Sequence, residues 1–137
     1  MMTLDQRRLV RQSFDSLRDQ AEPLALLFYG RLFELDTSAR RLFHNDLALQ
    51  ARKLMDTLST VTESLERFES MRPRLAELGR LHAGYGVRPD QYDIVSAALI
   101  WAIGQALGPD FDPATRDAWR LVLADVCNAM KEAAHHP

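Results

Sequence analysis

The sequence has a single cysteine, Cys127, among its 137 residues. One thiol cannot form a disulfide within the chain or supply a cysteine-based zinc cluster, which excludes a disulfide scaffold and a zinc ribbon. Any metal site must therefore use histidine, aspartate or glutamate side chains. We expect Cys127 to pack as a small core residue of the last helix.

Long apolar runs are also missing. The longest, Ala97 to Ile103, is far shorter than the roughly 18 to 20 residues that cross a bilayer. The first residues carry Asp5, Arg7 and Arg8 where a signal peptide would need an apolar core. These features predict a cytoplasmic protein without a membrane partner.

The chain has no excess of positive charge. Its 17 basic residues are spread along the sequence and outnumbered by 19 acidic ones, for a formal net charge of -2. Without a strongly basic face, nucleic acid is not an expected partner. The 47% of apolar residues is enough to predict one compact domain over residues 1–137 in place of a disordered chain.

Glycine and proline are few, with six of each. Between them, apolar residues recur every three or four positions, which is typical of amphipathic helices, and no stretch alternates strictly as a half-buried strand does. The sequence therefore predicts an all-α fold of about seven helices. They are expected over residues 4–17, from 23, in a short turn through 42–43, over 46–68, over 69–83, from 90 and from 113.

Three polar side chains interrupt the apolar stripes. His82 follows Leu78 at helical spacing, so its imidazole lies on the buried side of its helix, either satisfied by a hydrogen bond or serving as a metal or cofactor ligand. Gln50 can be explained as a residue at the edge of the apolar stripe of its helix, and Tyr29 as a tyrosine packed in the core. Together, the three are typical of a pocket for a flat apolar cofactor with one metal ligand and two hydrogen-bond donors.

Other chemistry has no clear signature in the sequence. It contains no nucleotide-binding glycine loop, no His-Glu-x-x-His zinc helix and no nucleophile elbow. The segment Gly84-Tyr85-Gly86 is better interpreted as a turn.

The order of several short motifs resembles the globin family, and more narrowly the single-domain bacterial haemoglobins and the globin domain of flavohaemoglobins. The motifs are Phe28-Tyr29, Leu42-Phe43, Gln50 to Leu54, Leu78 to His82, Pro89 to Tyr92 with Val95, and Ala118-Trp119. The resemblance spans about Leu4 to Ala134. It implies a globin fold around a haem pocket, with haem b as the cofactor.

Matched residue by residue, the resemblance makes His82 the proximal ligand of the haem iron, and Tyr29 and Gln50 the distal pair that donates to a bound gas. Phe43 would pack on the porphyrin, and Leu54 would wall the ligand site. Further cofactor contacts are implied for Lys53, Leu78, Val87, Tyr92 and Val95. For Lys53, a solvated side chain remains an open alternative.

A single axial histidine leaves one iron position open for a diatomic gas. The resemblance therefore implies reversible binding of dioxygen at a pentacoordinate iron, for storage, delivery or sensing, with carbon monoxide and nitric oxide as further ligands. The chief alternative is a nitric oxide dioxygenase served by a separate reductase.

Two departures from flavohaemoglobins weaken this enzymatic alternative. The chain stops at Pro137 without a reductase, and His136 stands where they have a glutamate that polarises the proximal histidine, with Glu132 one turn too early. A third alternative is a cofactor-free helical interaction domain. We expect a monomer or a weak homodimer.

Overall fold

The computed structural model describes residues 2–42 and 46–135. Within these ranges the chain forms six α-helices and no strand, which confirms the predicted all-α fold. The helices are α1 (Leu4–Leu17), α2 (Ala21–Leu35), α3 (Leu47–Glu63), α4 (Phe68–Gly84), α5 (Pro89–Leu107) and α6 (Pro113–His135). Four 3-10 turns accompany them: η1 (Arg18–Gln20), η2 (Thr37–Leu42), η3 (Leu65–Arg67) and η4 (Gly108–Asp110).

The middle of the chain differs in detail from the expected pattern. The short helix predicted through 42–43 is the 3-10 turn η2, and Phe43 lies outside the described residues. The helix predicted over 46–68 ends at Glu63, because the backbone tightens there: Ser64 N donates to Val61 O at 3.1 Å and Arg67 N donates to Ser64 O at 2.9 Å. These short-range bonds turn the chain back, so that α4 begins at Phe68.

Hydrogen-bonded caps fix where several helices begin. Thr3 and Gln6 form a reciprocal capping box at α1, with the Thr3 side chain accepting from Gln6 N at 3.1 Å. Asp46 accepts from Ala48 N at 2.9 Å at the start of α3, and Asp112 caps the start of α6. The boundaries of α3 and α6 therefore follow from local side-chain chemistry.

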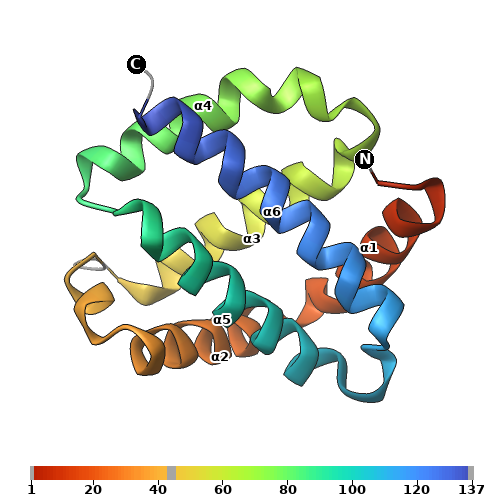
Figure 1. The fold of residues 1–137 in the computed structure, drawn as a ribbon. Coiled ribbons are helices and arrows are strands. Elements are labelled where there is room, and N and C mark those ends of the chain that lie inside the picture. The colour runs from red at the N-terminus through yellow and green to blue at the C-terminus, as the bar shows by residue number, and fades with distance from the viewer. Residues whose placement is uncertain (1, 43–45, 136–137) are drawn as a thin grey trace.

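The core gathers around α6, which crosses the molecule and packs on α4, α5 and α1 (Figure 1). Trp119 of α6 is fully buried, and its Nε1 donates to Ser13 Oγ of α1 at 2.8 Å. Its ring lies 6.5 Å from that of Phe14, measured between centroids. A buried indole N–H needs such a partner, so this bond fixes how α1 sits on α6.

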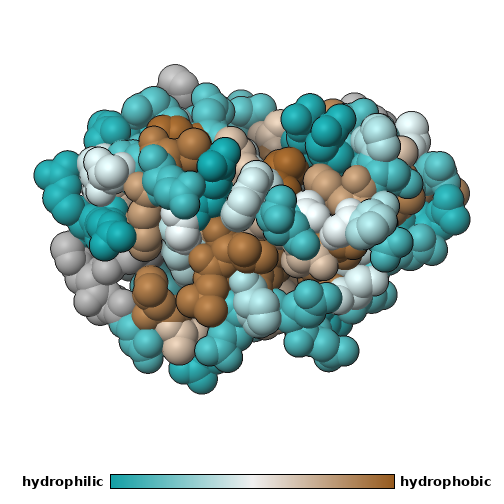
Figure 2. Space-filling model, turned by 90° about the horizontal axis from the view of Figure 1, so that it is seen from below, coloured by the Kyte–Doolittle hydropathy of each residue, from teal (hydrophilic) through white to brown (hydrophobic). Residues whose placement is uncertain are grey.

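The second major contact joins α2 to α5, and α3 packs on α2 and α1. The face seen from below is largely hydrophilic, with a hydrophobic patch near its middle (Figure 2). α2 runs along this side in Figure 1 and exposes Leu26 and Leu35. No helix in the described part of the chain is long and apolar enough to span a membrane.

Gly79 lies where α4 packs against the backbone of α6. A Cβ at this position would meet the carbonyl oxygen of Met130 and lie 2.8 Å from its Cα. Because the obstacle is backbone, we expect Gly79→Ala to lower the free energy of unfolding by about 1–3 kcal/mol. Urea unfolding followed by circular dichroism measures this change.

Gly30 of α2 provides the matched control, because an added Cβ there has nothing within 4 Å. Gly30→Ala should be neutral or stabilise the fold by up to about 1 kcal/mol, since alanine is the better helix former. If the two alanine variants were equally stable, the close α4–α6 contact would not be the reason for glycine at position 79.

Candidate functional site

The imidazole of His82 is held in one orientation by its own helix. His82 is half-buried in the last turn of α4, and its Nδ1 lies 2.6 Å from the carbonyl oxygen of Leu78. A carbonyl only accepts hydrogen bonds, so Nδ1 is the donor and Nε2 is the ring nitrogen left for a metal. The side chain thus has the tautomer and the fixed orientation of a metal-ligating histidine.

The end of α4 keeps the following chain close to His82. Gly86 has a φ of +95°, a left-handed conformation that favours glycine. Val87 N then donates to His82 O at 3.0 Å, which closes the helix end. Val87 is half-buried beside this turn, and the exposed ring of Tyr85 lies edge-on to the His82 imidazole at 6.4 Å between centroids.

Tyr29 is buried on α2 between aromatic neighbours. Only 5% of it is exposed, and its ring lies 5.0 Å from Phe28 and 6.2 Å from Phe33, measured between centroids. Burial raises the pKa of Tyr29 to about 12. Its hydroxyl therefore keeps its proton at physiological pH, as a hydrogen-bond donor must.

The remaining residues of the predicted distal side lie on α3, which packs on α2. Gln50 and Leu54 are half-buried, whereas Lys53 is exposed. The structure thus places the amide and the leucine at the edge of the core and the lysine at the surface. Their roles toward a ligand stay predictions.

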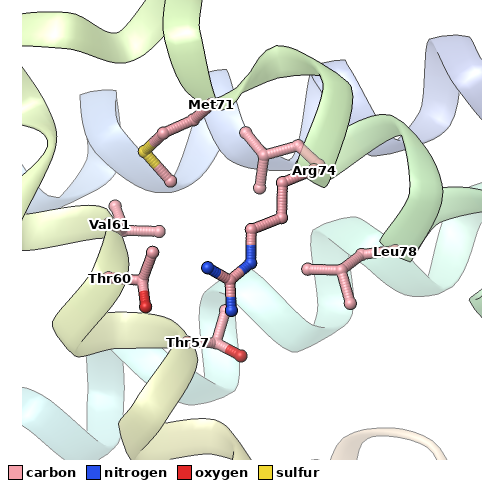
Figure 3. A pocket seen from close by; sticks show the side chains of 7 residues that line it. Thr57, Thr60, Val61, Met71, Arg74 and Leu78 are labelled. Carbon is pink, nitrogen blue, oxygen red and sulfur yellow. The ribbon is translucent and has the colours of Figure 1, made fainter.

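α3 and α4 border a common cavity. They are joined through η3 and diverge from it in Figure 1. The cavity has a volume of about 60 Å³ and is lined among others by Thr57, Leu78 and Arg74 (Figure 3). Gln50 and Leu54 share the helix face of Thr57 on α3, and His82 shares that of Leu78 on α4. The predicted site residues of both helices therefore lie on the faces that line this cavity.

α5 contributes Tyr92 and Val95. Val95 is half-buried, whereas Tyr92 is buried and its hydroxyl has no hydrogen-bond partner among the described residues. Burial raises the pKa of Tyr92, and the neighbouring Cys127 raises it further. A buried hydroxyl without a partner is costly, so this group is available to a hydrogen-bonding atom of a bound molecule.

Two residues of the cavity were not anticipated from the sequence, Arg74 and Thr57. Arg74 precedes Leu78 by four positions and His82 by eight, so it shares their helix face. This spacing from His82 was the available signal. Thr57 follows Leu54 by three positions, which was a weaker signal.

A buried glutamine ties the end of α2 to the start of α5. Gln91 is 3% exposed; its Nε2 donates to Asp36 Oδ2 at 3.0 Å, and its Oε1 accepts from Arg88 N at 2.8 Å. Asp36 also accepts from the backbone N of Ser38 at 3.0 Å. These bonds hold together the helices that carry Tyr29 and Tyr92.

The Asp36 bonds predict an acid-sensitive contribution to stability. Hydrogen bonds from the Ser38 and Gln91 side chains lower the pKa of Asp36 below its ordinary value of 3.8. Because the folded-state pKa is lowered, the contribution is complete above 3.8 and is lost as pH falls through the folded value. We expect Asp36→Ala to lower Tm at neutral pH and to differ less from the wild type in acid.

Thermal unfolding between neutral and acid pH tests this dependence, with Asp19→Ala as the control at an exposed carboxyl. A Tm difference for Asp36→Ala that stayed constant over the whole range would show that ionisation of Asp36 does not matter.

Comparisons with known proteins identify the family and the fold of the chain. The sequence profile of the globin family matches residues 26–130. The chain belongs to the globin family. It is 28% identical to neuroglobin of Tetraodon nigroviridis over 90% of this chain and 87% of the relative, and 26% identical to that of Danio rerio over 89% and 86%.

Solved structures show the same fold. An engineered carbene transferase, derived from a candidate nitric oxide dioxygenase of Rhodothermus marinus, matches with a TM-score of 0.87 and 24% identity over 98% of this chain and 94% of its own. A bacterial globin of Campylobacter jejuni matches with a TM-score of 0.84 and 24% identity over 96% of both chains. Membership of the globin family implies a haem cofactor and the binding of diatomic gases by this globin.

The predicted site residues have the chemistry to hold a haem. His82 would offer Nε2 to the iron, because its Nδ1 is engaged with Leu78 O. Leu54 and Val95 are half-buried apolar side chains suited to contact a flat hydrophobic ring, and the hydroxyl of Tyr92 has hydrogen-bonding capacity left.

Proposed function

We propose that this globin binds dioxygen reversibly at a pentacoordinate haem b iron held by Nε2 of His82. The observation that carries the proposal is the bond from Nδ1 to Leu78 O, which orients the imidazole and leaves Nε2 as the nitrogen that could hold a metal. Haem b held by His82 alone would leave its iron able to take up a diatomic gas. Storage, delivery and sensing of oxygen all follow from this chemistry.

The distal residues select among gases by hydrogen bonding. Dioxygen becomes polar on binding, so a donor favours it over carbon monoxide, which remains less polar. Tyr29 supplies such a donor, because its raised pKa keeps the hydroxyl protonated. Gln50 on α3 is proposed as the second donor. Leu54 restricts the access of water, which protects the ferrous state.

The contacts to the cofactor are proposed in the same way. Leu78 would contact the haem ring from α4, Val87 from the turn that follows α4, and Val95 from α5. Tyr92 would lie on the same side of the ring as His82. Phe43, outside the described residues, is proposed to pack on the porphyrin, and Lys53 to reach a propionate from the surface. Residues 1–137 are proposed to form one domain, a cytoplasmic monomer or weak homodimer.

Absorption spectra of the purified protein test the proposal directly. The protein is supplied with haemin, reduced with dithionite and exposed in separate samples to air and to carbon monoxide. A ferrous spectrum of a five-coordinate haem that converts to a stable oxygenated spectrum is the expected result. A protein that takes up no haem, or whose ferrous spectrum already shows two protein ligands, would contradict it.

A second candidate function is nitric oxide dioxygenation with electrons from a separate reductase. It is favoured by the likeness in fold to a protein derived from a candidate nitric oxide dioxygenase. The reaction would convert nitric oxide and dioxygen to nitrate. Repeated consumption of nitric oxide with a reductase and reduced nicotinamide supports this function, whereas a single turnover per haem leaves reversible oxygen binding as the function.

A further inference from the structure

The cavity between α3 and α4 is lined by polar and charged side chains as well as apolar ones. α3 contributes Thr57, Thr60 and Val61, and α4 contributes Met71, Arg74, Leu75 and Leu78. Its volume of about 60 Å³ suits a few water molecules or one small planar ion. Leu78 lines this cavity and also orients His82, so the cavity adjoins the proposed haem site.

The guanidinium of Arg74 extends from α4 across this cavity toward the hydroxyls of Thr57 and Thr60 (Figure 3). Four arginines of the described residues pair with a carboxylate three residues away along the chain, among them Arg72 with Glu69 at 2.8 Å. Glu77 stands three residues after Arg74, yet Arg74 makes no ion pair within 4.0 Å in residues 2–42 and 46–135. Its charge is therefore available to an anion.

The rest of the cavity wall suits an anion as well. No aspartate or glutamate lines it, and Val61 and Leu78 make part of it apolar, which strengthens a charged hydrogen bond. Thr60 Oγ1 is engaged with Asp56 O at 3.0 Å, whereas Thr57 is the hydroxyl available to donate. A guanidinium presents two parallel N–H groups, the pattern that matches a planar pair of oxygens.

We propose that Arg74 and Thr57 bind a small planar oxyanion at the inner edge of the haem site. The chemistry is that of a carboxylate or nitrate, and it has two sources: a free anion from solution, or a propionate of the haem itself. The second source rests on the proposed function. Arg74 is an exposed residue, so a free anion has access and would bind weakly, in the millimolar range.

Nitrate titration of the purified protein, with and without added haemin, tests the free-anion source. At constant ionic strength set with chloride, nitrate is expected to raise Tm with saturation, and Arg74→Met to weaken the response at least tenfold. Arg74→Lys should retain part of the nitrate response, because lysine keeps the positive charge but lacks the paired N–H groups of the guanidinium. Arg80→Met is the matched control, an exposed arginine of the same helix outside this cavity, and should respond like the wild type.

Haem transfer to an excess of apomyoglobin tests the propionate source. In that case nitrate has no effect on the wild type, and Arg74→Met releases haem about tenfold faster. Haem dimethyl ester, whose carboxylates are masked, would then leave both proteins at the same rate. If Arg74→Met matched the wild type in both the nitrate and the haem measurements, the oxyanion site would be refuted. If the wild type takes up no haem, the absorption spectrum shows this separately, and the proposed function is contradicted. The nitrate titration then still tests whether a free anion binds at Arg74.

Discussion

His82→Ala is expected to yield a folded protein that no longer retains haem. His82 is the proposed axial ligand, and its Nδ1 bond to Leu78 O holds it in place. Loss of a group that only orients a metal ligand costs about 10- to 100-fold in affinity, so loss of the ligand itself should cost more than about 100-fold. Haemin titration followed by the Soret band measures the change.

Two further proteins separate ligation from folding. His82→Gly supplied with imidazole in solution should regain a haem spectrum, because the free base can occupy the position of the missing ring. Tyr85→Phe changes the exposed ring that lies edge-on to the imidazole, and should bind haem like the wild type. Normal, stable haem content in His82→Ala, with circular dichroism showing intact helices, would mean that another residue holds the iron.

Tyr29→Phe is expected to speed the release of dioxygen by about tenfold to a hundredfold. This corresponds to the loss of one hydrogen bond made in a dry pocket, worth about 1–3 kcal/mol. The dissociation rate of carbon monoxide should change far less, because that gas is a poorer acceptor. Stopped-flow displacement of dioxygen by carbon monoxide measures the first rate, and the oxidation of the ferrous protein in air should also become faster.

The pKa of Tyr29 adds a pH test of the same role. Because burial raises it to about 12, the hydroxyl remains a donor and the wild-type release rate should be constant from neutral pH to pH 10. A release rate that rises with pH, with an apparent pKa near 10, would show that the Tyr29 hydroxyl is solvated. Gln50→Leu should speed release as well, and unchanged rates in both single variants would refute the distal pair.

Much of the candidate site was predictable because helical spacing orders residues along a face. The spacing of Leu78 and His82 predicted an imidazole on the buried side, and the structure shows the two residues joined by a hydrogen bond. Tyr29 was predicted on the apolar side of the second helix, and it is buried there. The exposure of Lys53 agrees with the solvated alternative.

Other features depend on segments that meet only in the fold. The unbroken helix expected over 46–68 is interrupted, because short-range backbone bonds at Ser64 outweigh a continuing apolar pattern. The bond from Gln91 to Asp36 joins positions 55 residues apart, which no local pattern reveals. The cavity around Arg74 likewise requires α3 and α4 to be placed side by side.

By itself, the sequence determined the helical class, the stripes that form the core and the three polar positions that interrupt them, because periodicity and capping act within one helix. Only the tertiary structure decided that Gly79 meets the backbone of Met130, that the hydroxyl of Tyr92 lacks a partner among the described residues and that Arg74 extends toward Thr57. Those relations depend on the distances between helices, which arise from the packing of the whole chain and are not encoded in any one segment.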